Sequence, residues 1–244
     1  MIDIHSHILP GVDDGAVTVD ESLKMAWLAV EDGITHLFAT PHHKLYTPLS
    51  RKEVAQRVDK LQARLDEAGI NLTILPGHEV RLEGDVFYDW EHGWASPLGN
   101  SRYVLAEPRF NFYDRQTDRM LQEFFARDCI PVMAHPERIR PIQNNLSLIE
   151  WFLERGGLTQ ITAHSLTGSH GQRAREVAEE MLERGMVHII ASDAHHAHRR
   201  PPILSTARDI AATIVGEAQA TAMVTTTPLA IVKNEPISVE MFAF

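Results

Sequence analysis

The fold is decided first by residues 2–40, IDIHSHILPGVDDGAVTVDESLKMAWLAVEDGITHLFAT. A short apolar run at 2–5 precedes an amphipathic stretch from Val19 to Asp32, and a second apolar run follows at 36–40. Gly33 suits the left-handed backbone that often ends a helix. A strand, a helix and a strand in this order predict two parallel strands joined by a crossover helix.

The same alternation continues along the chain. Further short runs rich in Ile, Val, Leu or Thr occur at 72–76, 102–106, 130–134, 158–163 and 187–192. Helical patterns lie between them, and Ser50-Arg51-Lys52-Glu53 predicts a capping box at the start of one helix. About seven such repeats predict a parallel sheet, either open and doubly wound or closed into a barrel.

No linker, composition shift or internal repeat divides the chain. We therefore predict an α/β fold with one domain over residues 1–244, a single seven-stranded (β/α) barrel. The least regular stretch, residues 80–100, is predicted to cap this structure with short helices.

Composition excludes several classes of protein. The formal net charge of −10 argues against binding to nucleic acid or to an anionic membrane, which needs a basic surface. No apolar run approaches the ~20 residues that cross a bilayer, so no membrane insertion is expected. The start of the chain lacks signal-peptide features and Cys129 is the one cysteine, so we expect a cytoplasmic location.

Histidines and acidic residues fall where the predicted strands end. In a parallel barrel these carboxyl ends meet at one mouth, where such barrels carry their active sites. His5 and His7 alternate along the first strand, which would place both rings on one side. The candidate metal ligands are His5, His7, Asp14, His42, Glu79, Glu107, His135, Asp193 and His195. Spacing alone leaves Asp13 open as an alternative to Asp14.

This ligand set is larger than one ion requires, because a structural zinc ion takes about four ligands. Two or three metal ions that share bridging carboxylates account for it better. A shell of nitrogen and oxygen without thiolate suits manganese, iron, zinc or cobalt. Without cations, so many carboxylates and imidazoles would be costly to gather at one mouth.

Five motifs in a fixed order resemble the polymerase and histidinol phosphatase (PHP) superfamily. They are MIDIHSHILPGVDDGA at 1–16, ATPHH at 39–43, LPGHEVRL at 75–82, AHPERIR at 134–140 and ASDAHH at 191–196. They are similar to one branch, the bacterial protein-tyrosine phosphatases encoded with capsular and exopolysaccharide genes. The resemblance covers nearly the whole chain. It implies a distorted (β/α)7 TIM-like barrel, the PHP fold, with three metal ions, manganese foremost among them.

The resemblance also implies which residues share each ion. His5, His7, Glu79 and Asp193 would hold the first metal; Glu79 would bridge to a second, completed by Glu107 and His135; Asp14, His42 and His195 would hold the third. Arg138 would contact the substrate phosphate, with Arg140 as a second contact. His164 departs from the family pattern, which has a small residue there, and this puts the shape of the pocket in doubt.

The ligand set and the resemblance together imply a metal-dependent phosphomonoesterase. A metal-held hydroxide would attack phosphorus directly, because a bound metal lowers the pKa of water to about 7. The branch implies a protein-tyrosine phosphatase in the control of capsule or exopolysaccharide biosynthesis, with a bacterial tyrosine kinase of polysaccharide assembly as its phosphotyrosyl protein partner. His43 or His196 is a candidate general acid for the leaving phenol.

Other functions compete with this reading. A cysteine phosphatase needs an arginine six residues after its thiolate, but His135 occupies that position relative to Cys129. A binuclear amidohydrolase also begins with the HxH pattern, yet would leave Asp14, His42 and His195 without a role. Histidinol phosphate or another small monoester is the main alternative substrate, and a non-catalytic metal-bound scaffold is a further alternative. Glu137 is predicted to orient an arginine or to cap a helix rather than to bind metal.

Overall fold

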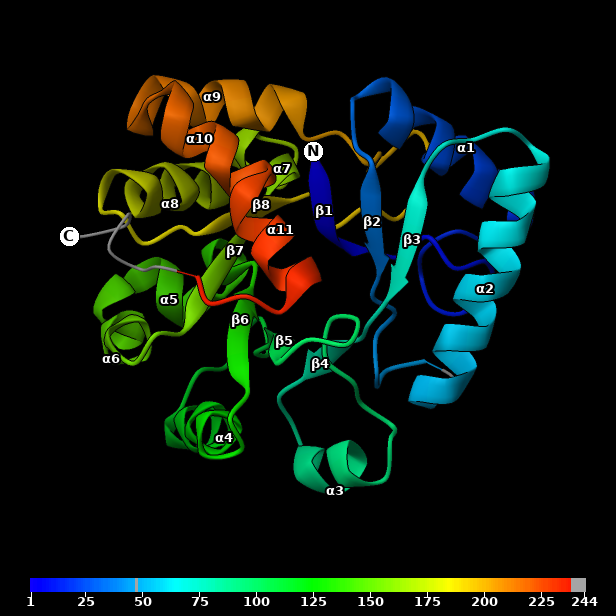
Figure 1. Ribbon diagram of the computed structural model, residues 1–244. Helices are drawn as coiled ribbons and strands as arrows, with labels where there is room; N and C mark the ends of the chain where they lie inside the picture. Colours follow the sequence, from blue (N-terminus) through cyan, green and yellow to red (C-terminus); the bar gives the residue numbers. More distant parts are fainter. Residues whose placement is uncertain (47, 238–244) are drawn as a thin grey trace.

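The computed structural model describes residues 1–46 and 48–237, so residues 238–244 of the predicted domain lie outside it. It is an α/β fold whose strands are all paired in parallel (Figure 1). The strands form a three-stranded sheet, β1-β2-β3, and a five-stranded sheet, β4-β5-β6-β7-β8. Their bounds are β1 Ile2–Ser6, β2 His36–Ala39, β3 Thr73–Pro76, β4 Glu79–Arg81, β5 Tyr103–Glu107, β6 Ile130–Ala134, β7 Leu158–Thr162 and β8 Ile189–Ala191.

All seven predicted runs form strands, but the prediction of seven strands is wrong for the described residues. The additional strand is β4, which lies at the border of residues 80–100, the stretch expected to be irregular, and pairs with β5. It has only three residues and follows Gly77, so it is too short to give a recognisable alternation. Its existence places Glu79 at the beginning of a strand rather than in a loop.

The two sheets are linked where their strands end. An isolated parallel bridge joins Ser6 to Ala194, and another joins His42 to Glu79. At the first link, the His7 amide donates to the Ala194 carbonyl at 2.7 Å and the Asp193 amide donates to the His5 carbonyl at 2.9 Å. The start of the chain therefore lies against the segment after β8.

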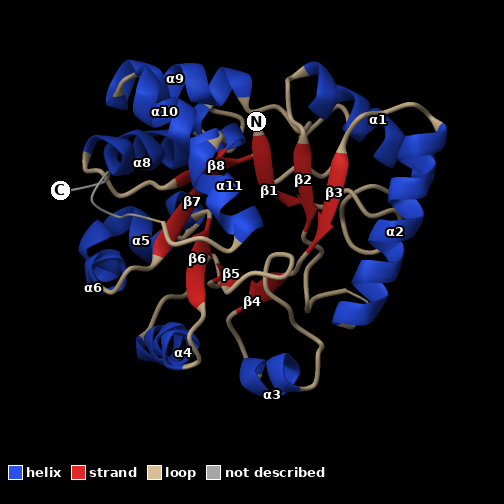
Figure 2. Ribbon diagram, viewed as in Figure 1, coloured by secondary structure: helices blue, strands red, loops and turns tan. Residues whose placement is uncertain are grey.

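Helices surround the strands (Figure 2). Their bounds are α1 Val19–Glu31, α2 Arg51–Glu67, α3 Val86–Glu91, α4 Arg115–Ala126, α5 Arg140–Asn144, α6 Glu150–Glu154, α7 Ala163–Leu166, α8 Gln172–Glu183, α9 Ser205–Val215, α10 Glu217–Val224 and α11 Thr226–Lys233, with 3-10 turns η1 Pro136–Arg138 and η2 Leu146–Ile149. The predicted capping box opens α2: Ser50 accepts the Glu53 amide and Glu53 accepts the Ser50 amide. Among the described residues, no helix is long and apolar enough to span a bilayer.

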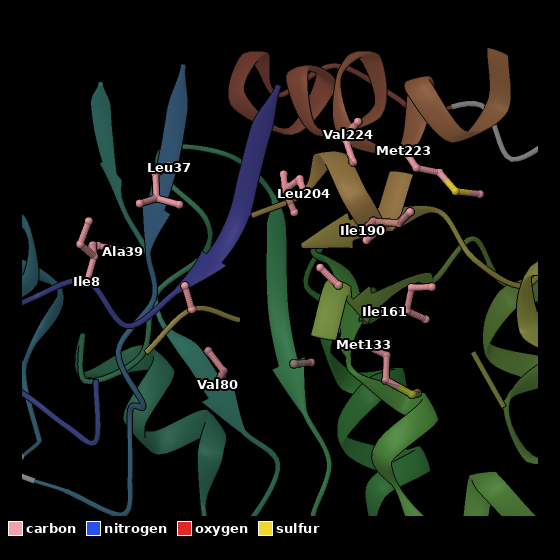
Figure 3. Packing of buried hydrophobic residues seen from close by; sticks show 14 of the residues in the cluster. Ile8, Leu37, Ala39, Val80, Met133, Ile161, Ile190, Leu204, Met223 and Val224 are labelled. Carbon is pink, nitrogen blue, oxygen red and sulfur yellow. The ribbon is translucent and has the colours of Figure 1, made fainter. Parts of the chain in front are cut away.

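The apolar core has two parts. One lies between the strands and the surrounding helices and includes Leu37, Val80 and Ile190 (Figure 3). The second gathers buried side chains from both sheets: Ile2, Ile4, Phe38, Tyr103, Leu105, Val132, Ala134, Leu158, Ile189 and Ala191, together with Leu98 and with Ile231 of α11. Strands of both sheets therefore contribute side chains to one common apolar cluster.

Candidate metal centre

All nine predicted ligands converge in one cluster, to which Glu79 contributes from the beginning of β4. Three groups of ligand atoms each lie within 4.8 Å of one another: His5, His7 and Asp193; His42, Glu79 and Glu107; and His7, Asp14, His42 and His195. His135 joins them through its Nε2, which lies 2.9 Å from Glu79 Oε1. The convergence depends on the links between the sheets, because these residues come from both ends of the chain.

Glu79 lies at the centre of the cluster. Its Oε1 is 3.4 Å from His5 Nε2, and its Oε2 is 3.4 Å from His7 Nε2 and 2.8 Å from His42 Nδ1. The Asp193 Oδ1 atom lies 3.4 Å from His5 Nε2. A carboxylate in contact with four imidazoles has the position of a bridge between neighbouring cations.

The two adjacent aspartates occupy different places. Asp14 Oδ1 lies 3.5 Å from His42 Nε2 and 3.4 Å from His195 Nε2, at the open side of the cluster. Asp13 instead accepts a hydrogen bond from His7 Nδ1 at 2.7 Å and from the Gly15 and His42 amides. The arrangement favours Asp14 over Asp13 as the residue beside the candidate ligands.

Residues behind the cluster fix the histidine rings. Gln160 of β7 accepts a hydrogen bond from His5 Nδ1 at 2.9 Å, and the Asp193 carbonyl accepts one from His195 Nδ1 at 2.9 Å. Together with Asp13 on His7, these bonds leave each Nε2 atom directed at the cluster, as is usual for metal-binding histidines. Gln160 was not predicted, because a lone glutamine in a buried strand carries no sequence signal.

The backbone is also constrained at the site. His135 and Asp193 have φ values of +35° and +52°, in the left-handed region that non-glycine residues rarely adopt. Such backbone conformations cost about 1–3 kcal/mol and tend to occur at functional sites. β8 ends at Ala191, so Asp193 and His195 lie after the strand, in a turn that begins with the left-handed Asp193.

Burial and neighbouring charges shift the acidities of these groups. Burial raises the pKa of Glu79, but His5 and His42 outweigh it and hold this pKa well below its usual range. Burial and the Glu79 charge raise the pKa of Glu107 to about 7, although Arg81 lies 2.9 Å from its Oε2 atom. Burial lowers the pKa of His135 to about 4. These opposing shifts show that the anionic and neutral-imidazole forms, which bind metal, are favoured at Glu79 and His135.

The cluster fits metal ions. Glu79 Oε2, Glu107 Oε2 and His42 Nδ1 are buried and make no hydrogen bond of good geometry, although Glu79 Oε2 lies 2.8 Å from His42 Nδ1 and Glu107 Oε2 lies 2.9 Å from Arg81. Bound cations would satisfy these atoms. The candidate donors are imidazole nitrogens and carboxylate oxygens, without sulfur, which suits first-row divalent ions.

Two arginines border the cluster at Asp193. Arg138 donates to Asp193 Oδ2 at 2.7 Å, and Arg200 donates to the same oxygen. Arg140, the other predicted phosphate contact, is exposed, and its guanidinium has no contact with the cluster among the described residues.

The two candidate general acids lie at the edge of the site. His43 is buried, its Nδ1 accepts the Arg81 amide at 2.9 Å and its Nε2 lies 3.3 Å from Asp89 Oδ2. Both ring nitrogens are therefore engaged with groups outside the nine-residue cluster, which makes His43 the less suitable of the two candidates. His196 is half-buried and lies 3.5 Å from Glu21.

Three other predictions concern residues outside the ligand set. Glu137 is buried and accepts hydrogen bonds from the Thr162 amide and the Ser165 hydroxyl, which ties the η1 turn to the start of α7. His164 bonds the Pro201 carbonyl at 3.1 Å and lines a cavity of about 270 Å³ beside the site. Burial raises the pKa of the Cys129 thiol, which argues further against a thiolate nucleophile.

Comparisons with known proteins agree with this site. A model of the family "Capsular polysaccharide synthesis, CpsB/CapC" matches residues 1–233. The chain is 39% identical to the tyrosine-protein phosphatase YwqE of Bacillus subtilis, over 82% of this chain and 79% of the relative. It is 29% identical to the tyrosine-protein phosphatase CpsB of Streptococcus pneumoniae, over 97% of this chain and the whole relative.

Comparison with solved structures also identifies metal-dependent tyrosine phosphatases as relatives. One matching structure comes from a study of YwqE of Bacillus subtilis and CpsB of Streptococcus pneumoniae, described there as unique metal-dependent tyrosine phosphatases. The chain superposes on it with a TM-score of 0.92 and 34% sequence identity, and the alignment covers 98% of this chain and 96% of the other. A dihydroorotase-like domain of Chaetomium thermophilum aligns with a TM-score of 0.58 but only 11% identity, over 96% of this chain and 79% of the other, which shows a shared fold alone. The chain belongs to the CpsB/CapC family of capsular polysaccharide synthesis proteins.

Proposed function

We propose that this protein is a metal-dependent tyrosine-protein phosphatase that acts in the control of capsule or exopolysaccharide biosynthesis. The observation that carries the proposal is the convergence of nine imidazole and carboxylate side chains, Glu79 among them, in a chain related to metal-dependent tyrosine phosphatases. The family leaves the binuclear amidohydrolase alternative without support beyond the shared fold.

Two or three metal ions, with manganese preferred, would be held by the nine clustered residues. His5, His7, Glu79 and Asp193 would hold the first ion, Glu79, Glu107 and His135 the second, and Asp14, His42 and His195 the third. When bound, the ions supply Lewis acidity and a water of lowered pKa for attack on phosphorus.

The arginines beside Asp193 would hold the substrate. Arg138 and Arg200 lie at the rim of the cluster, and guanidinium groups stabilise the negative charge that phosphoryl oxygens carry in the transition state. Arg140 would contribute at most a longer-range attraction, because its side chain is exposed. The leaving phenol of phosphotyrosine has a reference pKa near 10, so it needs little protonation as it departs. His196 remains the candidate acid.

The biological setting is part of the proposal. The substrate would be a phosphotyrosyl protein, a bacterial tyrosine kinase of polysaccharide assembly, in the cytoplasm. The chain would form one domain, a distorted (β/α)7-type barrel whose two sheets join at the Ser6–Ala194 and His42–Glu79 bridges, with β4 as a short additional strand. The apolar interior shared by both sheets supports this closure.

A substrate comparison tests the proposed function. Metal-free protein is loaded with Mn²⁺ and assayed on a phosphotyrosyl peptide, histidinol phosphate and p-nitrophenyl phosphate. We expect the phosphotyrosyl peptide to have the highest kcat/KM, and we expect His135→Ala to abolish turnover while Cys129→Ser keeps it. Preference for histidinol phosphate would assign a small-molecule phosphatase instead, and turnover by His135→Ala would exclude the metal centre.

A further inference from the structure

His135 differs from three other histidines of the cluster. His5, His7 and His195 each use Nδ1 in a hydrogen bond to Gln160, Asp13 and the Asp193 carbonyl, respectively. The Nδ1 atom of His135 is buried and has no hydrogen-bond partner. The outer bond that normally fixes the orientation of a metal-binding imidazole is therefore missing at this residue.

An aromatic ring packs against the face of this imidazole. Phe110, in the segment after β5, stacks on the His135 ring with centroids 5.1 Å apart and planes inclined by only 13°. The Phe110 carbonyl accepts the Arg140 amide at 2.8 Å, which ties this segment to the one that follows His135. This bond helps to fix the Phe110 backbone relative to the segment after His135.

The same phenyl ring contacts the proposed phosphate-binding arginine. The Arg138 guanidinium lies 4.9 Å from the Phe110 centroid, within the range of a cation–π contact, and donates to Asp193 at 2.7 Å. Phe110 and Arg138 also line a cavity of about 250 Å³, together with Gln143, His170 and Ala174. One side chain therefore touches a candidate metal ligand and a candidate phosphate contact.

We propose that Phe110 is a positioning residue, which fixes the orientation of the His135 imidazole and of the Arg138 guanidinium relative to each other. This inference rests on the proposed function, because it assigns those two residues to metal and phosphate binding. A parallel stack restricts the tilt of the imidazole, and the cation–π contact restricts the planar guanidinium. A flexible aliphatic side chain would fill the same space without either restriction.

The test compares Phe110→Leu with the ring-retaining Phe110→Tyr. Phe112→Leu is the matched control, because Phe112 lies in the same segment under its own arginine, Arg109, at 4.6 Å, and is 52% exposed. Mn²⁺ is titrated into metal-free protein by calorimetry, and KM and kcat are measured with p-nitrophenyl phosphate. For Phe110→Leu we expect the weakest Mn²⁺ site to bind about tenfold less tightly and KM to rise severalfold, with both values restored in Phe110→Tyr.

Wild-type Mn²⁺ affinity and KM in Phe110→Leu, or equal changes in Phe112→Leu, would overturn the role of Phe110. If Phe110→Leu does not fold, Phe110→Met keeps the apolar bulk without the ring and takes its place. Failure of the proposed function itself has a different signature, since the wild-type protein would then bind no Mn²⁺ or hydrolyse no phosphotyrosyl peptide.

Discussion

Asp13 and Asp14 are adjacent in the chain, yet their carboxylates face different histidines. Asp14 is 44% exposed and points at His42 and His195, whereas Asp13 is buried behind His7. The sequence could not separate the two, because both lie in one loop and have the same donor atoms. The geometry separates them by what lies within hydrogen-bond distance, which no spacing rule predicts.

Asp13→Ala should weaken metal binding without removing a candidate ligand. The change leaves His7 Nδ1 without its 2.7 Å acceptor, so the ring loses its fixed orientation and basicity. Loss of such an outer partner typically costs 10- to about 100-fold in metal affinity. Chelator competition with Mn²⁺ measures the change, and the exposed Asp20→Ala serves as the control; equal affinities in the two variants would contradict the assignment.

Gly15→Ala tests how closely the aspartate loop approaches the first strand. An added Cβ would lie 2.0 Å from the His7 carbonyl oxygen, so the loop must move, at a cost of about 1–3 kcal/mol. We expect lower stability in urea and weaker Mn²⁺ binding, because Asp13 and Asp14 would move with it. Gly69→Ala meets no atom within 4 Å and should lose stability through its positive φ alone, with Mn²⁺ affinity unchanged.

At the scale of elements, local sequence was informative wherever a run had enough residues to show a period. The long amphipathic pattern before Gly69 and its capping box predicted α2, and the apolar runs predicted seven strands. The three-residue β4 and the left-handed turn at Asp193 were missed, because pairing with β5 and contact with β1 create them. Tertiary contacts, rather than local preference, decide such short elements.

His188, directly before β8, predicts a pH dependence of stability. Burial lowers its pKa to about 3, and Nδ1 accepts the Thr159 amide of the neighbouring strand β7. The unfolded chain takes up a proton at this residue below about pH 6.5, whereas the folded chain does not, so stability falls as the pH decreases.

The size of this effect can be isolated with His188→Asn. Between pH 7.5 and 5, one such group lowers the free energy of unfolding by about 2 kcal/mol, at about 1.4 kcal/mol per pH unit below its unfolded pKa. Urea unfolding of metal-free protein at both pH values should show a smaller decrease for His188→Asn than for the wild type. Equal decreases would mean that His188 is protonated in the folded protein.

At the scale of the whole molecule, the predicted convergence of the ligands depended on one assumption, that the parallel strands form a closed barrel. Given that assumption, strand ends far apart in sequence had to meet, and the nine residues do meet. The contacts that orient them, such as Gln160 on His5 and Phe110 on His135, depend on side-chain packing between strands. Such packing leaves no pattern in a single sequence.

Metal removal should destabilise the entire fold. The cluster joins both sheets, so ions that bind only the folded state add about 2.7 kcal/mol at 100 times their Kd. For a chain of this size, chelation should therefore lower Tm by about 5–10 °C, and added Mn²⁺ should restore it. Calorimetry measures the shift, which should be smaller in His135→Ala and unchanged in Cys129→Ser; an identical Tm with and without chelator would contradict the prediction.

The bond from the Asp193 amide to the His5 carbonyl has a consequence for biosynthesis. During translation the first strand leaves the ribosome long before its partner segment exists, so His5 and His7 emerge without the companions that complete their site. A nascent chain, or a product truncated before residue 193, cannot assemble the cluster. The cluster is therefore complete only after the chain has been synthesised through His195.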